Sequence, residues 1–205
     1  MTAPGGARLL LLAPPGAGKS THGRLLAEAF AAPHISTGEL LRAEIAAGSE
    51  LGRRVEGLVA EGRLVPDDLV VEMVVRRLTE PAPVEAFVLD GFPRTLAQAE
   101  LGYAWASEHG LTFSAVLHLE VPEAELARRA AGRAAVSGRG DDNAATWERR
   151  MAEYRLETEP LLGFYRARGI LVEVDAGGGV SEVHQAILTA LWAMGLRPVR
   201  PARPA

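Results

Sequence analysis

A glycine-rich loop follows a short apolar run near the start of the chain. The apolar run is Leu9 to Leu12, and the loop after it reads Ala13-Pro14-Pro15-Gly16-Ala17-Gly18-Lys19-Ser20-Thr21. Because Gly16 and Gly18 carry no Cβ atom, the backbone can curl until successive N–H groups point at one phosphate. Lys19 adds a charge for the outer phosphates, and Ser20 and Thr21 offer hydroxyls toward a Mg²⁺ ion. The pattern predicts a strand, a phosphate-binding loop and then a helix from Lys19, and leaves ATPase, GTPase and kinase open.

Composition narrows the class of protein. The chain has 205 residues, of which 48% are hydrophobic, and this suits one compact domain. A net charge of −4 does not indicate a nucleic-acid partner, and the apolar runs are too short to indicate a membrane partner. The absence of cysteine excludes disulfides and cysteine-ligated zinc. The apolar run at the start of the chain is too short for a signal-peptide core or a membrane span, so we expect a soluble, cytoplasmic protein.

Apolar runs alternate with helical patterns along the rest of the chain. Strands are expected at residues 8–13, 33–36, 86–90, 115–121 and 170–174. Helices are expected at residues 19–30, 38–47, 51–61, 67–78, 96–109, 123–133, 143–167 and 181–194. This alternation predicts an α/β fold, with a parallel sheet of five strands covered by helices on both faces.

Two further motifs lie where a ligand of such a sheet would bind. The motif Leu89-Asp90-Gly91-Phe92-Pro93-Arg94 ends an expected strand, and open parallel sheets bind ligands beyond the carboxyl ends of their strands. Asp90 is placed there to hold Mg²⁺ or its waters, and Arg94 to contact a phosphate through two N–H groups. Thr37 and Arg42 offer a hydroxyl and a guanidinium to a second anion, although a helix start with a surface arginine explains them as well.

Arginines gather in the C-terminal half of the chain. Arg129 and Arg133 are four residues apart on one helix face, Arg139 lies in a short glycine-rich segment, and Arg149 and Arg150 follow. Phosphoryl transfer needs such a cluster, because negative charge spreads over the transferred group. A solvated basic face, which is common, is the alternative interpretation of these arginines.

Histidines do not form an evident site. The five of them fall at no metal-ligand spacing and in no triad pattern, so we expect structural or surface roles for His22, His34, His109, His118 and His184. The sequence therefore predicts no zinc site.

Together these motifs resemble the adenylate kinase family, from Leu9 to about Leu191. The family's loop usually reads Gly-x-Pro-Gly-x-Gly-Lys-Gly-Thr, and this chain departs from it at Ala13 and Ser20. The resemblance implies a P-loop NTPase fold in which ATP is held by Gly16, Ala17, Gly18, Lys19, Ser20, Thr21, Arg129, Arg133 and Gly178. It implies that AMP contacts Thr37, Arg42, Arg63, Leu64, Val65, Gly91, Phe92, Pro93, Arg94, Gln98, Arg139 and Arg150. The implied catalytic residues are Lys19, Arg94, Arg133, Arg139 and Arg150, with Mg²⁺ held mainly through water near Asp90, Ser20 and Thr21.

The resemblance also implies how the chain is organised. Residues 1–205 would form a single domain with a core of residues 7–35, 66–131 and 143–195, an AMP-binding segment at 36–65 and a disordered tail at 196–205. Many bacterial members carry a lid domain of a few dozen residues, whereas the lid here would be short, at residues 132–142. Without cysteine, this lid has no zinc.

The activity implied is reversible, Mg²⁺-dependent transfer of the terminal phosphoryl group of ATP to AMP, which gives two ADP. The enzyme would be a cytoplasmic monomer that serves adenine nucleotide homeostasis. Two alternatives stay open, namely a kinase for UMP or CMP and a non-catalytic nucleotide-binding module. Thr37 and Gln98 favour adenine, because relatives that prefer pyrimidines usually differ at both positions.

Overall fold

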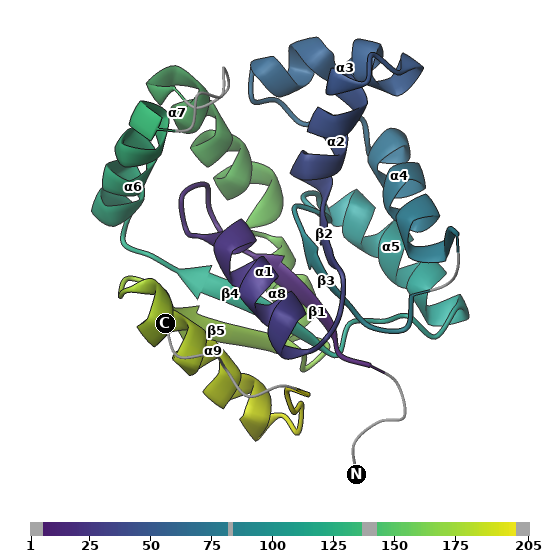
Figure 1. Ribbon diagram of the computed structural model, residues 1–205, viewed down its shortest axis with the longest axis vertical. Coiled ribbons are helices and arrows are strands. Elements are labelled where there is room, and N and C mark those ends of the chain that lie inside the picture. Colours follow the sequence, from purple (N-terminus) through teal and green to yellow (C-terminus); the bar gives the residue numbers. More distant parts are fainter. Residues whose placement is uncertain (1–5, 82–83, 137–142, 200–205) are drawn as a thin grey trace.

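The sheet runs through the centre of the molecule. The computed structural model describes residues 6–81, 84–136 and 143–199 (Figure 1). Within them, five strands form one parallel sheet in the order β2-β3-β1-β4-β5. The strands are β1 (Arg8–Leu12), β2 (His34–Ser36), β3 (Phe87–Asp90), β4 (Ala115–Glu120) and β5 (Leu171–Asp175). The predicted five-stranded parallel sheet is confirmed.

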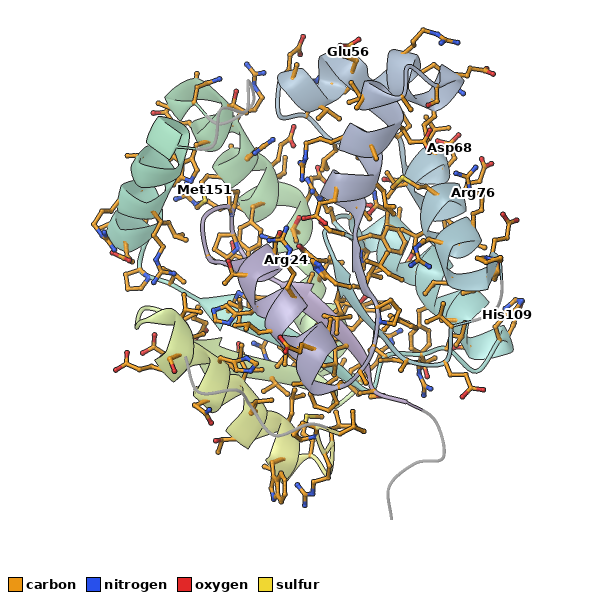
Figure 2. The ribbon with its side chains drawn as sticks, in the orientation of Figure 1. Arg24, Glu56, Asp68, Arg76, His109 and Met151 are labelled. Atoms are coloured by element: carbon orange, nitrogen blue, oxygen red, sulfur yellow. The ribbon has the colours of Figure 1, made fainter. Side chains whose placement is uncertain are left out.

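Helices flank this sheet. They are α1 (Lys19–Ala29), α2 (Thr37–Ala46), α3 (Glu50–Ala60), α4 (Asp67–Thr79), α5 (Leu96–Glu108), α6 (Glu123–Val136), α7 (Ala144–Glu153), the π-helical turn η1 (Tyr154–Thr158), α8 (Leu161–Arg166) and α9 (Val180–Ala193). Charged side chains such as Glu56, Asp68 and Arg76 are exposed on the outer surfaces of α3 and α4 (Figure 2). In the part of the chain that the structure describes, no helix is both long and apolar enough to span a bilayer.

Two apolar cores follow from the alternation of side chains along β1. Leu9 and Leu11 pack with residues of α1 and α9, whereas Leu10 and Leu12 pack with residues of α4, α5 and α8. Successive side chains of a strand point to opposite faces, so a continuous run of leucines requires burial on both faces. The apolar run before the phosphate loop is therefore the centre of the fold.

One expected helix is wrong as a continuous element. Residues 143–167 form α7, then the π-helical turn η1, then α8, because the chain widens its hydrogen-bond ring and then meets a proline. The N–H of Glu159 donates to the carbonyl of Tyr154 over 2.8 Å, five residues back, and Pro160 has no N–H to continue the ladder. Arg150 lies in α7, before this break, and Thr158 is the last residue of the turn.

The segment predicted to bind AMP, residues 36–65, forms mainly α2 and α3, which stand beside α7 at one end of the molecule (Figure 1). Of the predicted lid, residues 132–136 belong to α6 and residues 137–142 lie outside the described part. Of the predicted tail, Leu196 packs on the core and the N–H of Val199 donates to the carbonyl of Ala29 over 3.0 Å. Residues 200–205 lie outside the described part.

Candidate functional site

The loop between β1 and α1 has the backbone that a phosphate cradle requires. Gly16 and Gly18 both adopt left-handed conformations, with φ of 94° and 92°. Only glycine enters this region without a steric penalty. Lys19 begins α1, and its Nζ donates to the carbonyls of Ala13 and Pro14, over 2.6 and 3.1 Å. The ammonium therefore lies against the loop, at the N-terminal end of a helix, where an anion is favoured.

A buried carboxylate faces this loop from the end of β3. The Ser20 hydroxyl donates to Oδ2 of Asp90 over 2.9 Å, and Nε2 of His34 lies 3.7 Å from the same oxygen. Burial by itself raises the pKa of Asp90, but His34, Lys19 and Ser20 outweigh it and hold the pKa below its ordinary value. Asp90 is therefore ionised at neutral pH, although it is only 3% exposed.

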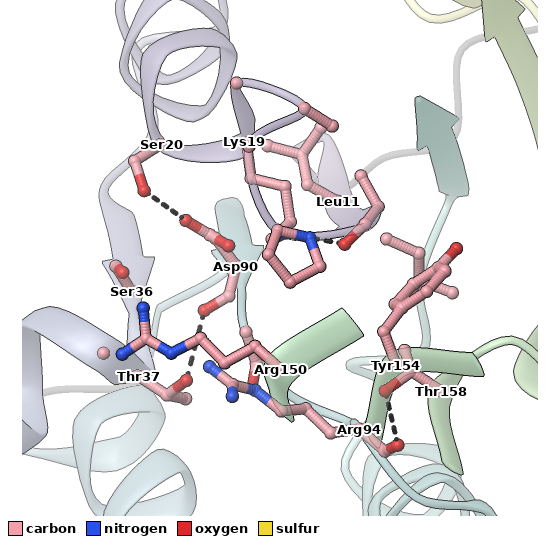
Figure 3. A pocket seen from close by; sticks show the side chains of 18 of the residues that line it. Leu11, Lys19, Ser20, Ser36, Thr37, Asp90, Arg94, Arg150, Tyr154 and Thr158 are labelled. Atoms are coloured by element: carbon pink, nitrogen blue, oxygen red, sulfur yellow. Dashed lines mark hydrogen bonds between the residues drawn. The ribbon is translucent and has the colours of Figure 1, made fainter. Parts of the chain in front are cut away.

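Arginines converge on the other side of Asp90. Figure 3 shows the side chains of Arg94 and Arg150 extending toward Thr37, beside Asp90. Burial lowers the pKa of Arg94, Asp90 raises it, and the positive charges of Arg150 and Arg42 lower it further. The carboxylates of Asp90 and Glu153 offset part of the repulsion among these guanidinium groups, and an anion bound among them would offset more of it. The cluster is therefore suited to a phosphate.

The turn after β3 brings the two sides of the site together. Gly91 has a φ of 88°, and a Cβ there would lie 2.4 Å from Oγ1 of Thr37. Nε of Arg94 donates to the Gly91 carbonyl over 2.8 Å, and the Thr37 hydroxyl to the Asp90 carbonyl over 3.4 Å. Glycine is required at this turn for its φ and for its lack of a side chain.

Gln98 is held in place by its neighbours. Its Oε1 accepts the N–H of Arg94 over 2.7 Å, and its Nε2 donates to Oδ1 of Asp67 over 2.6 Å. Thr95 caps α5 by accepting the N–H of Gln98 over 3.1 Å. The amide is 1% exposed and still borders the cavity described below. A Gln98 side chain locked in this way can present one fixed edge to a ligand.

Arg129 joins α6 to the loop after β5. Its Nε donates to Glu125 over 2.7 Å, and one terminal nitrogen donates to the carbonyls of Ala176, Gly177 and Gly178, over 3.0, 3.2 and 3.2 Å. Hydrogen bonds from Arg128 and Arg129 lower the pKa of Glu125 to about 2. Arg129 thereby positions the loop that carries Gly178.

These groups line one cavity of about 770 Å³. It brings together Gly16, Ala17, Gly18, Lys19, Ser20, Thr21, Thr37, Arg42, Arg63, Leu64, Val65, Asp90, Gly91, Pro93, Arg94, Gln98, Arg129, Arg150 and Gly178. Phe92 does not line it, because its side chain is 5% exposed and packs in the core with α4, α5 and α8. The Arg133 side chain and all of Arg139 lie outside the described residues.

Sequence reasoning missed several residues of the cavity. Glu153, Tyr154 and Thr158 line it from the end of α7 and from η1, and Trp147 lines it from α7. Burial raises the pKa of Glu153 against the opposing effect of Arg94. Thr158 donates to the Arg94 carbonyl over 2.8 Å (Figure 3). The only sequence signal for these residues was their place in the helix after the arginine cluster.

Comparison with known proteins agrees with this architecture. A family model described as adenylate kinase matches residues 11–170. The adenylate kinase of Thermus thermophilus is 46% identical over 186 residues, which cover 91% of this chain and 97% of that protein. Those of Thermobifida fusca and Xanthomonas oryzae are 44% and 45% identical over 184 residues, covering 90% of this chain and 97% and 98% of those proteins. The chain belongs to the adenylate kinase family.

Proposed function

We propose that this phosphotransferase moves the terminal phosphoryl group of ATP to AMP, reversibly, and forms two molecules of ADP. The observation that carries the proposal is the single cavity of about 770 Å³, which has a phosphate loop at one end and Thr37, Arg42 and Arg94 at the other. Its volume lies toward the upper end of the range for small-molecule sites, as two nucleotides require. The family relatives, each named adenylate kinase, support the same activity.

The reaction needs no covalent enzyme intermediate. A phosphate oxygen of AMP attacks the γ-phosphorus of ATP in line, and the bond from that phosphorus to the β–γ bridging oxygen breaks as ADP leaves. Lys19, Arg94 and Arg150 line the cavity where negative charge would spread over the transferred group. Arg133 and Arg139 are proposed to join them. The chain contributes position and charge.

The residues around Asp90 fit a Mg²⁺ ion bound together with the nucleotide. Asp90 is ionised and buried at the cavity wall, and Ser20 holds one of its oxygens over 2.9 Å. Oxygen donors of this kind suit Mg²⁺, which usually keeps several waters and shares phosphate oxygens. When bound, Mg²⁺ would neutralise phosphate charge, and Asp90 would orient the waters of its shell together with Ser20 and Thr21.

The proposal also covers the identity of the nucleotide base, the cellular location and the oligomeric state. Residues 63–65 and Gln98 border the end of the cavity assigned to AMP, and the loop at Gly178 borders the end assigned to the ATP adenine. We propose adenine at both positions, in a cytoplasmic monomer with no nucleic-acid or membrane partner. Turnover with AMP, UMP, CMP and GMP tests the base, and the proposal requires AMP to have by far the highest kcat/KM.

Arg94→Ala is the sharpest single test of the reaction. We expect kcat to fall by about 10³-fold or more, because one arginine at the transferred group contributes that much in related phosphoryl transfers. The control is Arg24→Ala, which removes a guanidinium that is 62% exposed, pairs with Glu39 and does not line the cavity. A coupled assay of ADP formation measures both. Near-normal turnover of Arg94→Ala would contradict the assignment.

A bisubstrate mimic tests whether one cavity holds both nucleotides. Two adenosines joined through five phosphates should raise the melting temperature much more than ATP alone, because one ligand gains the contacts of two. Tight binding of ATP and AMP without any formation of ADP would instead indicate a non-catalytic module. Equal stabilisation by the mimic and by ATP would indicate a single nucleotide site.

A further inference from the structure

A histidine and two glutamates lie together at the β4–β5 edge of the sheet, away from the nucleotide phosphates. His118 of β4 is paired in register with Glu173 of β5, and Glu120 is the next residue but one along β4. Because side chains alternate along a strand, these three point to the same face of the sheet. That face is the one covered by η1 and α8, since Tyr154 and Arg166 contact it.

The ring of His118 presents a nitrogen to these carboxylates without a hydrogen-bond partner. The residue is 8% exposed, and its Nδ1 is buried and unpaired. Oε1 of Glu120 lies 3.8 Å from Nδ1, which is too long for a hydrogen bond. One ligand atom from each of His118, Glu120 and Glu173 lies within 4.8 Å of the other two. Two bonds of about 2.1 Å to one ion hold their ligand atoms at most about 4.2 Å apart, so the side chains must rotate inward to bind it.

The surroundings of the cluster are those of a metal-binding histidine. Nε2 of His118 lies 3.1 Å from the Tyr154 hydroxyl, and such a partner on the second nitrogen fixes the ring and its tautomer. Arg166 donates to Oε1 of Glu173 over 2.7 Å and leaves the other carboxylate oxygen for a ligand. The carboxylates of Glu120, Glu173 and Glu159 outnumber the single guanidinium of Arg166 around the ring. The local charge therefore favours a dication.

We propose that His118, Glu120 and Glu173 form a binding site for a divalent transition ion of the Zn²⁺ class, distinct from the Mg²⁺ site of the nucleotide. A nitrogen ligand favours Zn²⁺, Ni²⁺ or Cu²⁺ over Mg²⁺, which prefers oxygen alone. Nδ1 of His118 is the ring nitrogen that can face an ion, because it has no hydrogen-bond partner and Nε2 lies against the Tyr154 hydroxyl. The three ligands leave positions for water, and the glutamates are exposed enough to admit an ion.

This site cannot be recognised from the sequence, and the sequence therefore predicts no zinc site. Fifty-odd residues separate Glu173 from the other two ligands, and only the parallel pairing of β4 with β5 brings them together. The site also touches the nucleotide cavity through one residue, because Tyr154 contacts His118 and lines that cavity. An ion bound to Nδ1 fixes the proton on Nε2, so the Tyr154 oxygen must then accept it.

Calorimetric titration of the chelator-treated, nucleotide-free chain with Zn²⁺ alone tests the proposal. We expect one site per chain, and His118→Gln and Glu173→Gln should each weaken its Kd at least ten-fold, a scale seen even for loss of outer-shell partners. The matched control is His109→Gln, which removes an exposed imidazole at the end of α5 (Figure 2) and should leave the Kd unchanged. Urea unfolding of each variant verifies that it is folded.

Nitrogen-15 NMR of the imidazole rings locates the ion without reference to activity. The Nδ1 resonance of His118 should shift on addition of one equivalent of Zn²⁺, and its Nε2 should keep its proton. If His118→Gln does not fold, Glu173→Gln still tests the proposal, because Glu173 is exposed. The proposal is overturned if wild-type protein binds no Zn²⁺, if both variants keep its affinity, or if His34 responds in place of His118.

Discussion

Gly91 shows how much depends on a single residue. Gly91→Ala places a methyl group 2.4 Å from Oγ1 of Thr37 and forces an L side chain to a φ of 88°. We expect a loss of stability larger than the cost of the left-handed backbone by itself, which is about 1–2 kcal/mol. The KM for AMP should rise as well, because Thr37 must move. Urea unfolding and steady-state kinetics measure the two effects.

Gly110→Ala separates the backbone effect from the steric one. Gly110 has a φ of 67°, and a Cβ there meets nothing within 4 Å. This variant should lose only about 1–2 kcal/mol for its backbone conformation and keep the KM for AMP. If Gly110→Ala and Gly91→Ala lose the same stability and behave alike with AMP, then the contact with Thr37 has no role.

Residues were predictable from sequence where their chemistry is rare and local. Gly16, Gly18 and Lys19 form one contiguous motif, and Asp90 and Arg94 form another, so both were found and both line the cavity. Asp67 was not found, because a carboxylate in the first turn of a helix is common and its contact with Gln98 spans 31 residues. Reactive groups are therefore easier to predict from the sequence than the residues that hold them in position.

At the scale of elements, the π-helical turn η1 connects α7, which carries Arg150, to α8. Thr158→Val removes the hydroxyl that donates to the Arg94 carbonyl over 2.8 Å, at a residue only 8% exposed. We expect a loss of about 1–3 kcal/mol, because the buried carbonyl loses a partner, and a lower kcat, because Arg94 shifts. Unfolding in urea and the coupled ADP assay report each effect.

Thr79→Val is the matched control for this turn. Thr79 also donates through its hydroxyl, to the Val75 carbonyl over 2.9 Å, but it does so in the last turn of α4 and outside the cavity. Its substitution should change stability by less than about 1 kcal/mol and leave kcat unaltered. A fall in kcat equal to that of Thr158→Val would mean that η1 has no special part in positioning Arg94.

Helices and strands were predicted best where the local sequence pattern is strong. The strands were predicted well, because buried parallel strands read as apolar runs. The helix expected at 143–167 failed at η1, since a π-helical turn is selected by packing and leaves no composition signal. Pro160 was the one visible clue, and proline within a helical pattern marks a break.

At the scale of the whole molecule, the order β2-β3-β1-β4-β5 places the two motifs proposed to bind phosphate in one cavity. Strand β1 ends in the phosphate loop, and its neighbour β3 ends in Asp90. Parallel strands bring their carboxyl ends to one edge, so motifs about 70 residues apart in sequence become neighbours. The meeting of these two motifs is predictable from the sheet type. The pairing of β4 with β5 at the far edge of the sheet is not.

The buried histidines tie the stability of the whole molecule to pH. Burial, with the charges of His184 and Arg129, lowers the pKa of His22 to about 4, well below its ordinary value of 6.5. Between these values the unfolded chain binds a proton that the folded chain does not, so acid favours unfolding. The free energy of unfolding should therefore fall as pH drops from about 6.5 to about 4. One such proton accounts for at most about 1.4 kcal/mol per pH unit.

Urea unfolding of wild type and His22→Gln across this pH window tests the linkage. The variant should have a shallower slope, although not a flat one, because burial also lowers the pKa of His184 and of His118. His109→Gln, which removes an exposed ring, should keep the wild-type slope. Comparing slopes cancels the packing that His22→Gln loses at every pH. Parallel curves of unfolding free energy against pH for wild type and His22→Gln would mean that His22 titrates alike in the folded and unfolded chains. The burial of His22 among α1 and α9 would then not explain the loss of stability in acid.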